Sequence, residues 1–213
     1  MNWELLTNFS LAMLAILNPI GLIPIWSELA GDEQRNIQTK LAVLVTLTSG
    51  VILIIFLIFG RQVLELFHID VPSFQMAGGI FLLLTGIRML EGKTARLKNR
   101  EEDGDNSNEI AKKRFRKIIV PLGIPMLAGP GSITTVLIYG IKAENVSDYA
   151  GLSVILLAAI LILFLFFYSS HWLDKKVDKL VFTVFTRIFG LIIAAIAVSF
   201  IFEALKKAFP SIG

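Results

Sequence analysis

The chain has 213 residues, of which 55% are hydrophobic and only 17% are charged, and its formal net charge is +3. A soluble domain carries roughly 25% charged residues, so this composition indicates a protein surrounded by lipid. The chain contains no cysteine, which excludes a disulfide framework, a thiol nucleophile and a cysteine-ligated metal. Its start, Met1-Asn2-Trp3-Glu4, lacks the basic region of a signal peptide, and we expect the first apolar stretch to remain in the mature protein.

Six apolar segments are long enough to cross a membrane. A transmembrane helix needs about 20 mostly apolar residues, because each helical residue advances the chain by about 1.5 Å. The sequence therefore predicts an all-α membrane protein with six transmembrane helices. In chain order the predicted spans are Leu5–Leu29, Leu41–Gly60, Phe74–Leu90, Ile118–Ile141, Tyr149–Trp172 and Phe185–Leu205.

The distribution of basic residues predicts how these spans are oriented. The first, third and fifth loops, with their flanks, hold 16 of the 20 Lys and Arg residues, and the other side holds Arg61, Lys142, Lys206 and Lys207. Basic residues of short loops are retained in the cytoplasm. We therefore expect loops one, three and five to be cytoplasmic and both termini to lie outside.

The third loop divides the chain into two halves. Its centre, Asn99–Asn108, has no apolar side chain and cannot offset the entropy of ordering by burial. It predicts a flexible cytoplasmic linker at 92–117, between a first three-helix repeat at 1–91 and a second at 118–213. We expect the basic residues that flank the linker to fix topology and to contact anionic lipid rather than nucleic acid.

The first and fourth spans are interrupted by proline and glycine at matching positions. One break reads Asn18-Pro19-Ile20-Gly21 and the other Gly129-Pro130-Gly131-Ser132, with Pro130 lying 111 positions after Pro19. The same offset carries Gly79 onto Gly190. Each half has three spans, an odd number, so the second half would enter the membrane from the opposite side. The pattern predicts a 3+3 inverted repeat with broken first and fourth helices.

Both breaks have the residue types of a helix start. Asn is a favoured N-cap and Pro is favoured at the first helical position, which is the order of Asn18 and Pro19. Gly129 and Pro130 offer the same arrangement with a weaker cap. We therefore predict that each broken span is two half-helices, the second beginning near the middle of the membrane. Such a start presents N–H groups and about half a positive charge, which suits an anionic group.

The sequence predicts a substrate-binding site at these two starts, which symmetry would make face each other across the bilayer centre. A broken helix survives in lipid only where protein or water covers it, and a matched pair of breaks is typical of transporters. The alternative is that Pro and Gly merely kink packed helices. The candidate substrate-binding residues are Asn18, Pro19, Gly21, Gly129, Pro130, Gly131, Ser132 and Thr135.

The spans lack ionisable residues near their centres, and this narrows the substrate. The ionisable residues Arg88, Glu91, Arg187 and Glu203 fall at span ends, where snorkelling to the interface is the ordinary explanation. The site therefore favours a small solute of little net charge, such as a zwitterion whose carboxylate meets the helix starts. Serine and threonine hydroxyls in the spans could contribute, or could bond back to their own helices.

Signals for an enzyme are weak. His68 and His171 fall at opposite faces of the predicted membrane segment and cannot share a metal ion. The Gly129–Ser132 run has the spacing of neither a nucleophile elbow nor a phosphate loop, and no span interior offers a Lys or His to activate a serine. We expect no enzymatic activity, no metal and no cofactor.

These motifs resemble the MarC family, which includes the SnatA-type small neutral amino-acid transporters. The resemblance covers nearly the whole chain and rests on Asn18–Pro24, Met76–Ile80, Pro121–Ile133 and Thr186–Gly190. It implies a six-helix protein of the bacterial inner membrane that works as a secondary transporter of glycine, alanine and similar amino acids. The implied partners are a neutral amino acid and the lipid bilayer, with a homo-oligomer left open.

A passive channel for small neutral solutes is the alternative function. Aquaporins also pair Asn-Pro half-helix starts in an inverted three-plus-three repeat. The second break here is Gly129-Pro130 rather than Asn-Pro, however, and an Arg normally guards the aquaporin pore. A structural or assembly protein, the third class, would need no symmetrical breaks.

Overall fold

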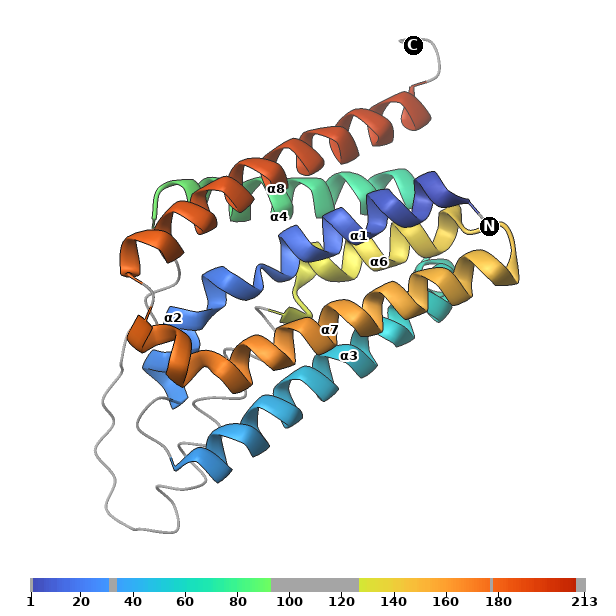
Figure 1. Cartoon of the computed structure of the whole chain (residues 1–213). Coiled ribbons are helices and arrows are strands. Elements are labelled where there is room, and N and C mark those ends of the chain that lie inside the picture. The colour runs from blue at the N-terminus through green and yellow to red at the C-terminus, as the bar shows by residue number, and fades with distance from the viewer. Residues whose placement is uncertain (1, 31–33, 93–126, 177, 210–213) are drawn as a thin grey trace, which may run out of the picture.

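The computed structural model describes residues 2–30, 34–92, 127–176 and 178–209. All the regular structure in these ranges is helical, which confirms the predicted all-α class, and the helices form one bundle with roughly aligned axes (Figure 1). The helices are α1 (Trp3–Leu17), α2 (Pro19–Ala30), α3 (Arg35–Leu66), α4 (Val71–Leu90), α6 (Pro130–Lys142), α7 (Val146–Lys176) and α8 (Lys179–Ala208). The predicted linker, beyond residue 92, and the first part of the predicted fourth span lie outside the described residues.

Five segments of the described chain are long and apolar enough to cross a membrane. They coincide with predicted spans one, two, three, five and six, and they are Trp3–Ser27, Arg35–Leu66, Val71–Leu90, Val146–Ser170 and Leu180–Ala208. The first of them includes α1 and most of α2. Helix α6 has 13 residues and is therefore only about 20 Å long, too short to span a bilayer by itself, as a half-helix should be.

Several helices extend beyond the predicted spans because a helix ends at a capping residue and not at the edge of its apolar stretch. Helix α3 continues to Leu66, and His68 follows it with a left-handed backbone, φ +53°. Asp178 caps the start of α8 by accepting a hydrogen bond from the Leu180 N–H at 3.0 Å. Asp70 caps α4 in the same way, and the side-chain and backbone hydrogen bonds of Ser73 hold the pKa of its carboxyl below the ordinary value.

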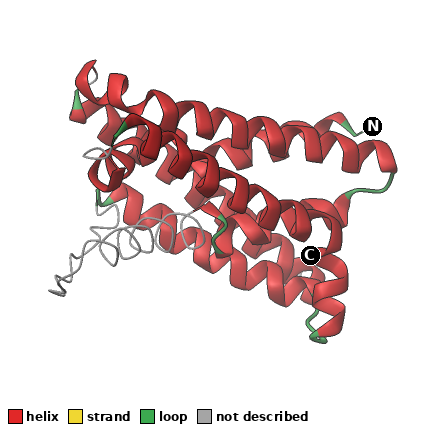
Figure 2. Ribbon diagram, turned by 90° about the horizontal axis from the view of Figure 1, so that it is seen from below, coloured by secondary structure: helices red, strands yellow, loops and turns green. Residues whose placement is uncertain are grey.

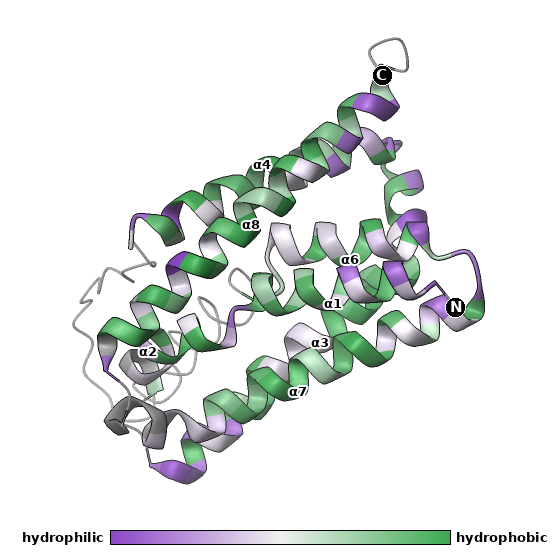
Figure 3. Ribbon diagram, turned by 45° about the horizontal axis from the view of Figure 1, so that its top comes forward, coloured by the Kyte–Doolittle hydropathy of each residue, from purple (hydrophilic) through white to green (hydrophobic). Residues whose placement is uncertain are grey.

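The outer faces of the bundle are apolar. Large side chains such as Leu47, Leu161 and Leu191 are each more than half exposed. Hydrophobic residues predominate along the long helices, and hydrophilic residues lie mainly at the helix ends (Figure 3). Apolar surface on this scale would be an aggregation liability in water. In a bilayer it is the surface that contacts lipid. The start of α1 and the end of α8 lie at the same end of the bundle (Figures 1 and 2).

Small residues bring α4 and α8 into close antiparallel contact. A Cβ atom on Gly86 would lie 2.7 Å from the carbonyl oxygen of Gly190, and one on Gly79 would lie 3.1 Å from the carbonyl oxygen of Ala197. Close backbone approach at small residues is the usual way in which membrane helices associate. Elsewhere the core is aromatic, with Trp26 of α2 stacked on Phe167 of α7 at a centroid distance of 4.4 Å.

Gly86→Ala is expected to lower stability by about 1–3 kcal/mol, the usual cost of overpacking, because the new methyl group would meet backbone that cannot rotate away. The measurement is thermal unfolding of the purified protein in detergent. Gly151→Ala is the matched control, since its Cβ would meet a methyl group of Leu6 at 2.8 Å, and that side chain can move. Equal unfolding midpoints for the two variants would contradict this account of the α4–α8 contact.

Candidate functional site

Asn18 forms the junction between α1 and α2. Its backbone is left-handed, with φ 40° and ψ 61°, and its N–H donates to the Leu14 carbonyl at 3.1 Å, which ends α1. Its side-chain oxygen accepts the Gly21 N–H at 3.1 Å, and its carbonyl accepts the Leu22 N–H at 3.2 Å. The prediction that Asn18 caps a half-helix beginning at Pro19 is confirmed. Asn is among the few non-glycine residues that adopt this backbone readily, so it can both end one helix and begin the next.

Gly21 is required by the packing around this junction. A Cβ atom at Gly21 would overlap the Asn18 side chain and would lie 2.7 Å from the hydroxyl oxygen of Thr186. Thr186 comes from α8, is buried, and donates its hydroxyl to the Phe182 carbonyl at 2.8 Å. The first break is therefore closed on one side by the first third of α8.

The second break starts α6 at Pro130. Gly129 precedes it with extended backbone, φ −82° and ψ 177°, and provides no side-chain cap. The N–H groups of Gly131 and Ser132 are in the first turn, where a helix offers no backbone acceptor. The Ser132 hydroxyl points back at the preceding loop, with the Leu127 carbonyl at 2.6 Å and the Gly129 carbonyl at 3.1 Å as acceptors. Among the described residues, no side chain thus caps the two backbone donors at this start.

The two breaks lie at the same level of the bundle. Helices α1 and α6 are packed antiparallel (Figure 1), and the rings of Phe9 and Tyr139 meet at a centroid distance of 5.2 Å. Asn18 is nine residues beyond Phe9, and Pro130 is nine residues before Tyr139. Each step is about 14 Å along its helix, and both run in the same direction through the bundle. The structure therefore places the two predicted starts at one depth of the bundle.

The candidate residues differ in burial and in their hydrogen bonds. Asn18, Pro19, Gly21, Gly129, Ser132 and Thr135 are buried, Gly131 is half-buried and Pro130 is exposed. The Thr135 hydroxyl donates to the Gly131 carbonyl of its own helix at 2.8 Å, as Thr46 and Thr85 do to Ala42 and Phe81 in theirs. A side chain with such a bond must break or share it to reach a ligand. At the second start, the backbone N–H groups of Gly131 and Ser132 are thus more available donors than these hydroxyl groups.

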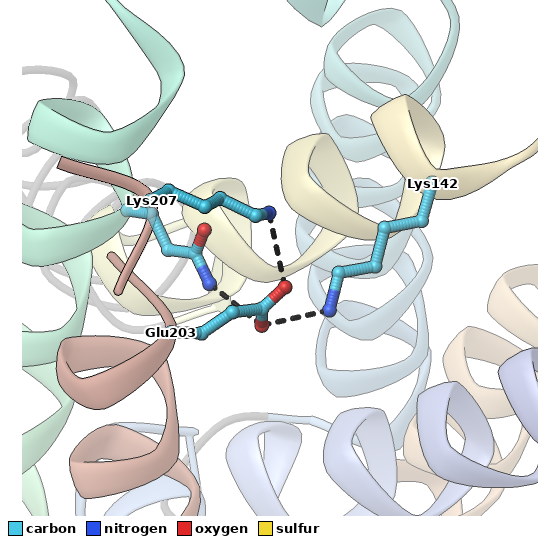
Figure 4. Close-up of polar contacts among 4 residues, drawn as sticks. Lys142, Glu203 and Lys207 are labelled. Carbon is cyan, nitrogen blue, oxygen red and sulfur yellow. Dashed lines mark hydrogen bonds and ion pairs between the residues drawn. The ribbon is translucent and has the colours of Figure 1, made fainter. Parts of the chain in front are cut away.

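A polar cluster near the ends of α6 and α8 was not predicted from the sequence. Gln75 of α4 is fully buried and donates from Nε2 to Glu203 Oε2 at 2.9 Å. Lys142 Nζ lies 2.8 Å from the same oxygen, and Lys207 Nζ lies 3.0 Å from Oε1 (Figure 4). Glu203, which we expected to snorkel to the interface, is two-thirds shielded and joins three helices. One feature of the sequence could have pointed to Gln75. The offset of 111 pairs Gln75 with Thr186, and each is a polar residue in the apolar third span of its half.

The arrangement defines a polytopic integral membrane protein with two helix breaks at the centre of its bundle. Residues 3–209 match the model of the MarC family integral membrane proteins, and the chain belongs to this family. It is 32% identical to the UPF0056 membrane protein YvbG of Bacillus subtilis, over 99% of this chain and 98% of that protein. It is 30% identical to the UPF0056 membrane protein YhcE of Escherichia coli, over 96% and 94% of the two chains.

The similarity extends to archaea. The UPF0056 membrane protein PH0760 of Pyrococcus horikoshii is 32% identical over 92% of both chains. No solved structure matches the chain. The family expected from the sequence motifs is thus confirmed over the whole bundle, and these relatives have nearly the same length as this chain.

Proposed function

We propose that the protein is a secondary transporter of small neutral amino acids, of the glycine and alanine type, in the bacterial inner membrane. The observation that carries this proposal is the pair of half-helix starts at one depth of a lipid-facing bundle. Each start directs backbone N–H groups and the positive end of a helix dipole into the protein, which suits a carboxylate. Discontinuous helices of this kind form the substrate sites of many secondary transporters.

The helix packing supports an inverted 3+3 repeat of six spans. When both members of the Gly79–Ala197 contact are moved by the offset of 111, they become Gly190 and Gly86, which form the other close contact of α4 with α8. Helix α3 packs on α6 as α7 packs on α2, and α4 packs on α6 as α8 packs on α2. Six crossings, an even number, also agree with the start of α1 and the end of α8 lying at one end of the bundle.

Both termini are proposed to lie outside the cytoplasm, and single cysteines can test this. Asn106→Cys and Ser211→Cys are expected to react with a membrane-impermeant maleimide from opposite sides, with position 211 labelled in intact cells. The chain has no cysteine of its own, so no background needs to be removed. Labelling of both variants after permeabilisation is the control for reactivity. If both positions react from the same side, the proposed number of crossings is wrong.

Uptake by proteoliposomes is the test of the proposed function. Radiolabelled glycine and alanine are expected to enter vesicles containing the purified protein with saturable kinetics, with each amino acid competing with the other. A site that alternates its access must close around its substrate, and this limits the rate. Uptake is measured with and without a proton or sodium gradient, against vesicles lacking protein. Fast osmotic shrinkage in stopped flow without saturable amino-acid uptake would favour the passive channel instead.

A further inference from the structure

We propose that Glu203, Gln75 and Tyr139 form a binding site for a primary ammonium group, and that the ammonium of Lys142 occupies this site in the present conformation. The site lies where α6 and α8 end, apart from the two half-helix starts. Two sources could supply the ammonium group. One is a neutral amino acid, and only for this ligand does the inference rest on the proposed function. The other source of the same chemistry is the ethanolamine headgroup of a lipid, because the ends of a transmembrane bundle lie among headgroups.

The residues around Lys142 are those that an ammonium group requires. Its Nζ lies 2.8 Å from Glu203 Oε2 and 5.6 Å from the centroid of the Tyr139 ring, so a carboxylate and an aromatic face both stabilise the charge. The Tyr139 ring is held in place by Phe9 and Phe200, at centroid distances of 5.2 and 6.5 Å. The carboxylate is also held, since Lys207 bonds its second oxygen (Figure 4).

Gln75 supplies an acceptor that Lys142 does not use. Its side chain is fully buried. Among the buried side-chain nitrogen and oxygen atoms of the described residues, Oε1 is the one that lacks a hydrogen-bond partner. The amide cannot reverse, because Nε2 donates to Glu203 Oε2 at 2.9 Å and a reversed amide would place oxygen against oxygen. Since Oε1 shares its carbon with Nε2, the unpaired acceptor lies beside the Lys142–Glu203 ion pair.

An unmet buried acceptor marks a place where a donor is expected. An ammonium group has three N–H donors and can bond Glu203 and Gln75 Oε1 together. The Lys142 ammonium, which is tethered to the end of α6, makes the first bond and leaves the second unmade. In the proposed site, a free ammonium, which no tether restrains, would gain this second hydrogen bond when it replaces the ammonium of Lys142.

The site is separate from the half-helix starts but is connected to one of them. Pro130 and Lys142 are the first and last residues of α6, about 18 Å apart along the helix, so one small amino acid cannot occupy both places. Release of Lys142 from Glu203 removes the ion pair between α6 and α8. Binding of an ammonium group would therefore free the end of the half-helix whose start is the candidate substrate site.

Removal of the tethered ammonium should open the site to a free one. In detergent without ethanolamine lipids, Lys142→Met is expected to bind ethylammonium at least tenfold more tightly than the unmodified protein, by isothermal titration calorimetry. Lys207→Met is the matched control: it also removes a lysine from Glu203, but Lys142 stays in place, so no comparable gain is expected. Gln75→Met in the Lys142→Met background should abolish most of the gain. Equal affinities for Lys142→Met and Lys207→Met, or a gain that survives Gln75→Met, would overturn the site.

Size-exclusion profiles establish that each variant is folded, and Lys142→Gln replaces Lys142→Met if the latter is not. Glycine that competes with ethylammonium, where acetate does not, identifies the amino acid as the ligand. Competition by phosphatidylethanolamine added to phosphatidylcholine nanodiscs, without competition by glycine, identifies the headgroup. Because ethylammonium binding is measured without transport, its failure refutes this site alone. Intact binding with no uptake of glycine or alanine refutes only the proposed transport function.

Discussion

Gly129→Leu is expected to reduce glycine and alanine uptake at least tenfold while leaving the protein inserted and folded. The backbone at Gly129 is extended, with φ −82° and ψ 177°, so any L-residue can adopt it without strain. The position is buried directly before the start of α6. A leucine side chain there would cover the N–H groups of Gly131 and Ser132, which we assign to the substrate carboxylate. A tenfold loss corresponds to about 1.4 kcal/mol of binding or barrier free energy.

Two further variants separate access from stability at the helix starts. Gly129→Ser should stabilise α6, because serine is a favoured N-cap, yet it should raise the KM since its hydroxyl competes with the substrate for the same N–H groups. Asn18→Gly keeps the freedom to adopt the left-handed backbone and removes only the cap on Gly21. Expression, monodispersity and uptake are compared for all variants. Normal uptake by a well-folded Gly129→Leu protein would leave the breaks as kinks without a role in binding.

Aspartate and lysine are expected to compete at least tenfold less well than alanine for the uptake of labelled glycine. The described parts of the spans provide backbone dipoles and hydroxyl groups around the two starts, with the ionisable cluster of Glu203 at the far end of α6. Transfer of an extra unpaired charge into such a site carries a large desolvation cost. A zwitterion such as alanine has a net charge of zero and therefore brings no extra net charge into the site.

The measurement is inhibition of glycine uptake by a series of amino acids of similar size and different charge. Serine and asparagine are the controls, since they are neutral and serve to separate the effect of polarity from that of charge. Equal inhibition by alanine, aspartate and lysine would show that the site does not distinguish substrates by charge. It would contradict binding at two helix starts that lack a buried side chain of opposite charge.

The five spans found in the described residues could be predicted from the sequence because hydropathy depends on the residues of one segment alone. The helix starts at Pro19 and Pro130 could be predicted for the same reason, since capping is a local property of Asn18 and Gly129. The ends of α3 could not be placed, because the helix continues from Arg35 to Leu66 through residues that lie beyond the apolar stretch. Nothing in local hydropathy marks where such an extension ends.

Contacts between distant residues were beyond sequence reasoning. The bond of Gln75 to Glu203 joins positions 128 apart and depends on how α4 and α8 cross. The second role of Asn18, as the end of α1, also went unpredicted, because a left-handed backbone at one residue depends on both helices that flank it. The predicted roles of Ser132 and Thr135 in binding remain predictions, and both hydroxyls donate to nearby carbonyls here.

The antiparallel contact of α4 with α8 has an energetic consequence. Its two closest points, Gly79 with Ala197 and Gly86 with Gly190, exchange places under the offset of 111. In the proposed inverted repeat, a displacement that opens one end of this contact would have a counterpart that opens the other end. In that proposed repeat, these two contacts alone would favour neither of the two opposite tilts. Any resting preference must come from residues that the offset does not reproduce, and Glu203 is one of them, since Gly92 takes its place in the first half.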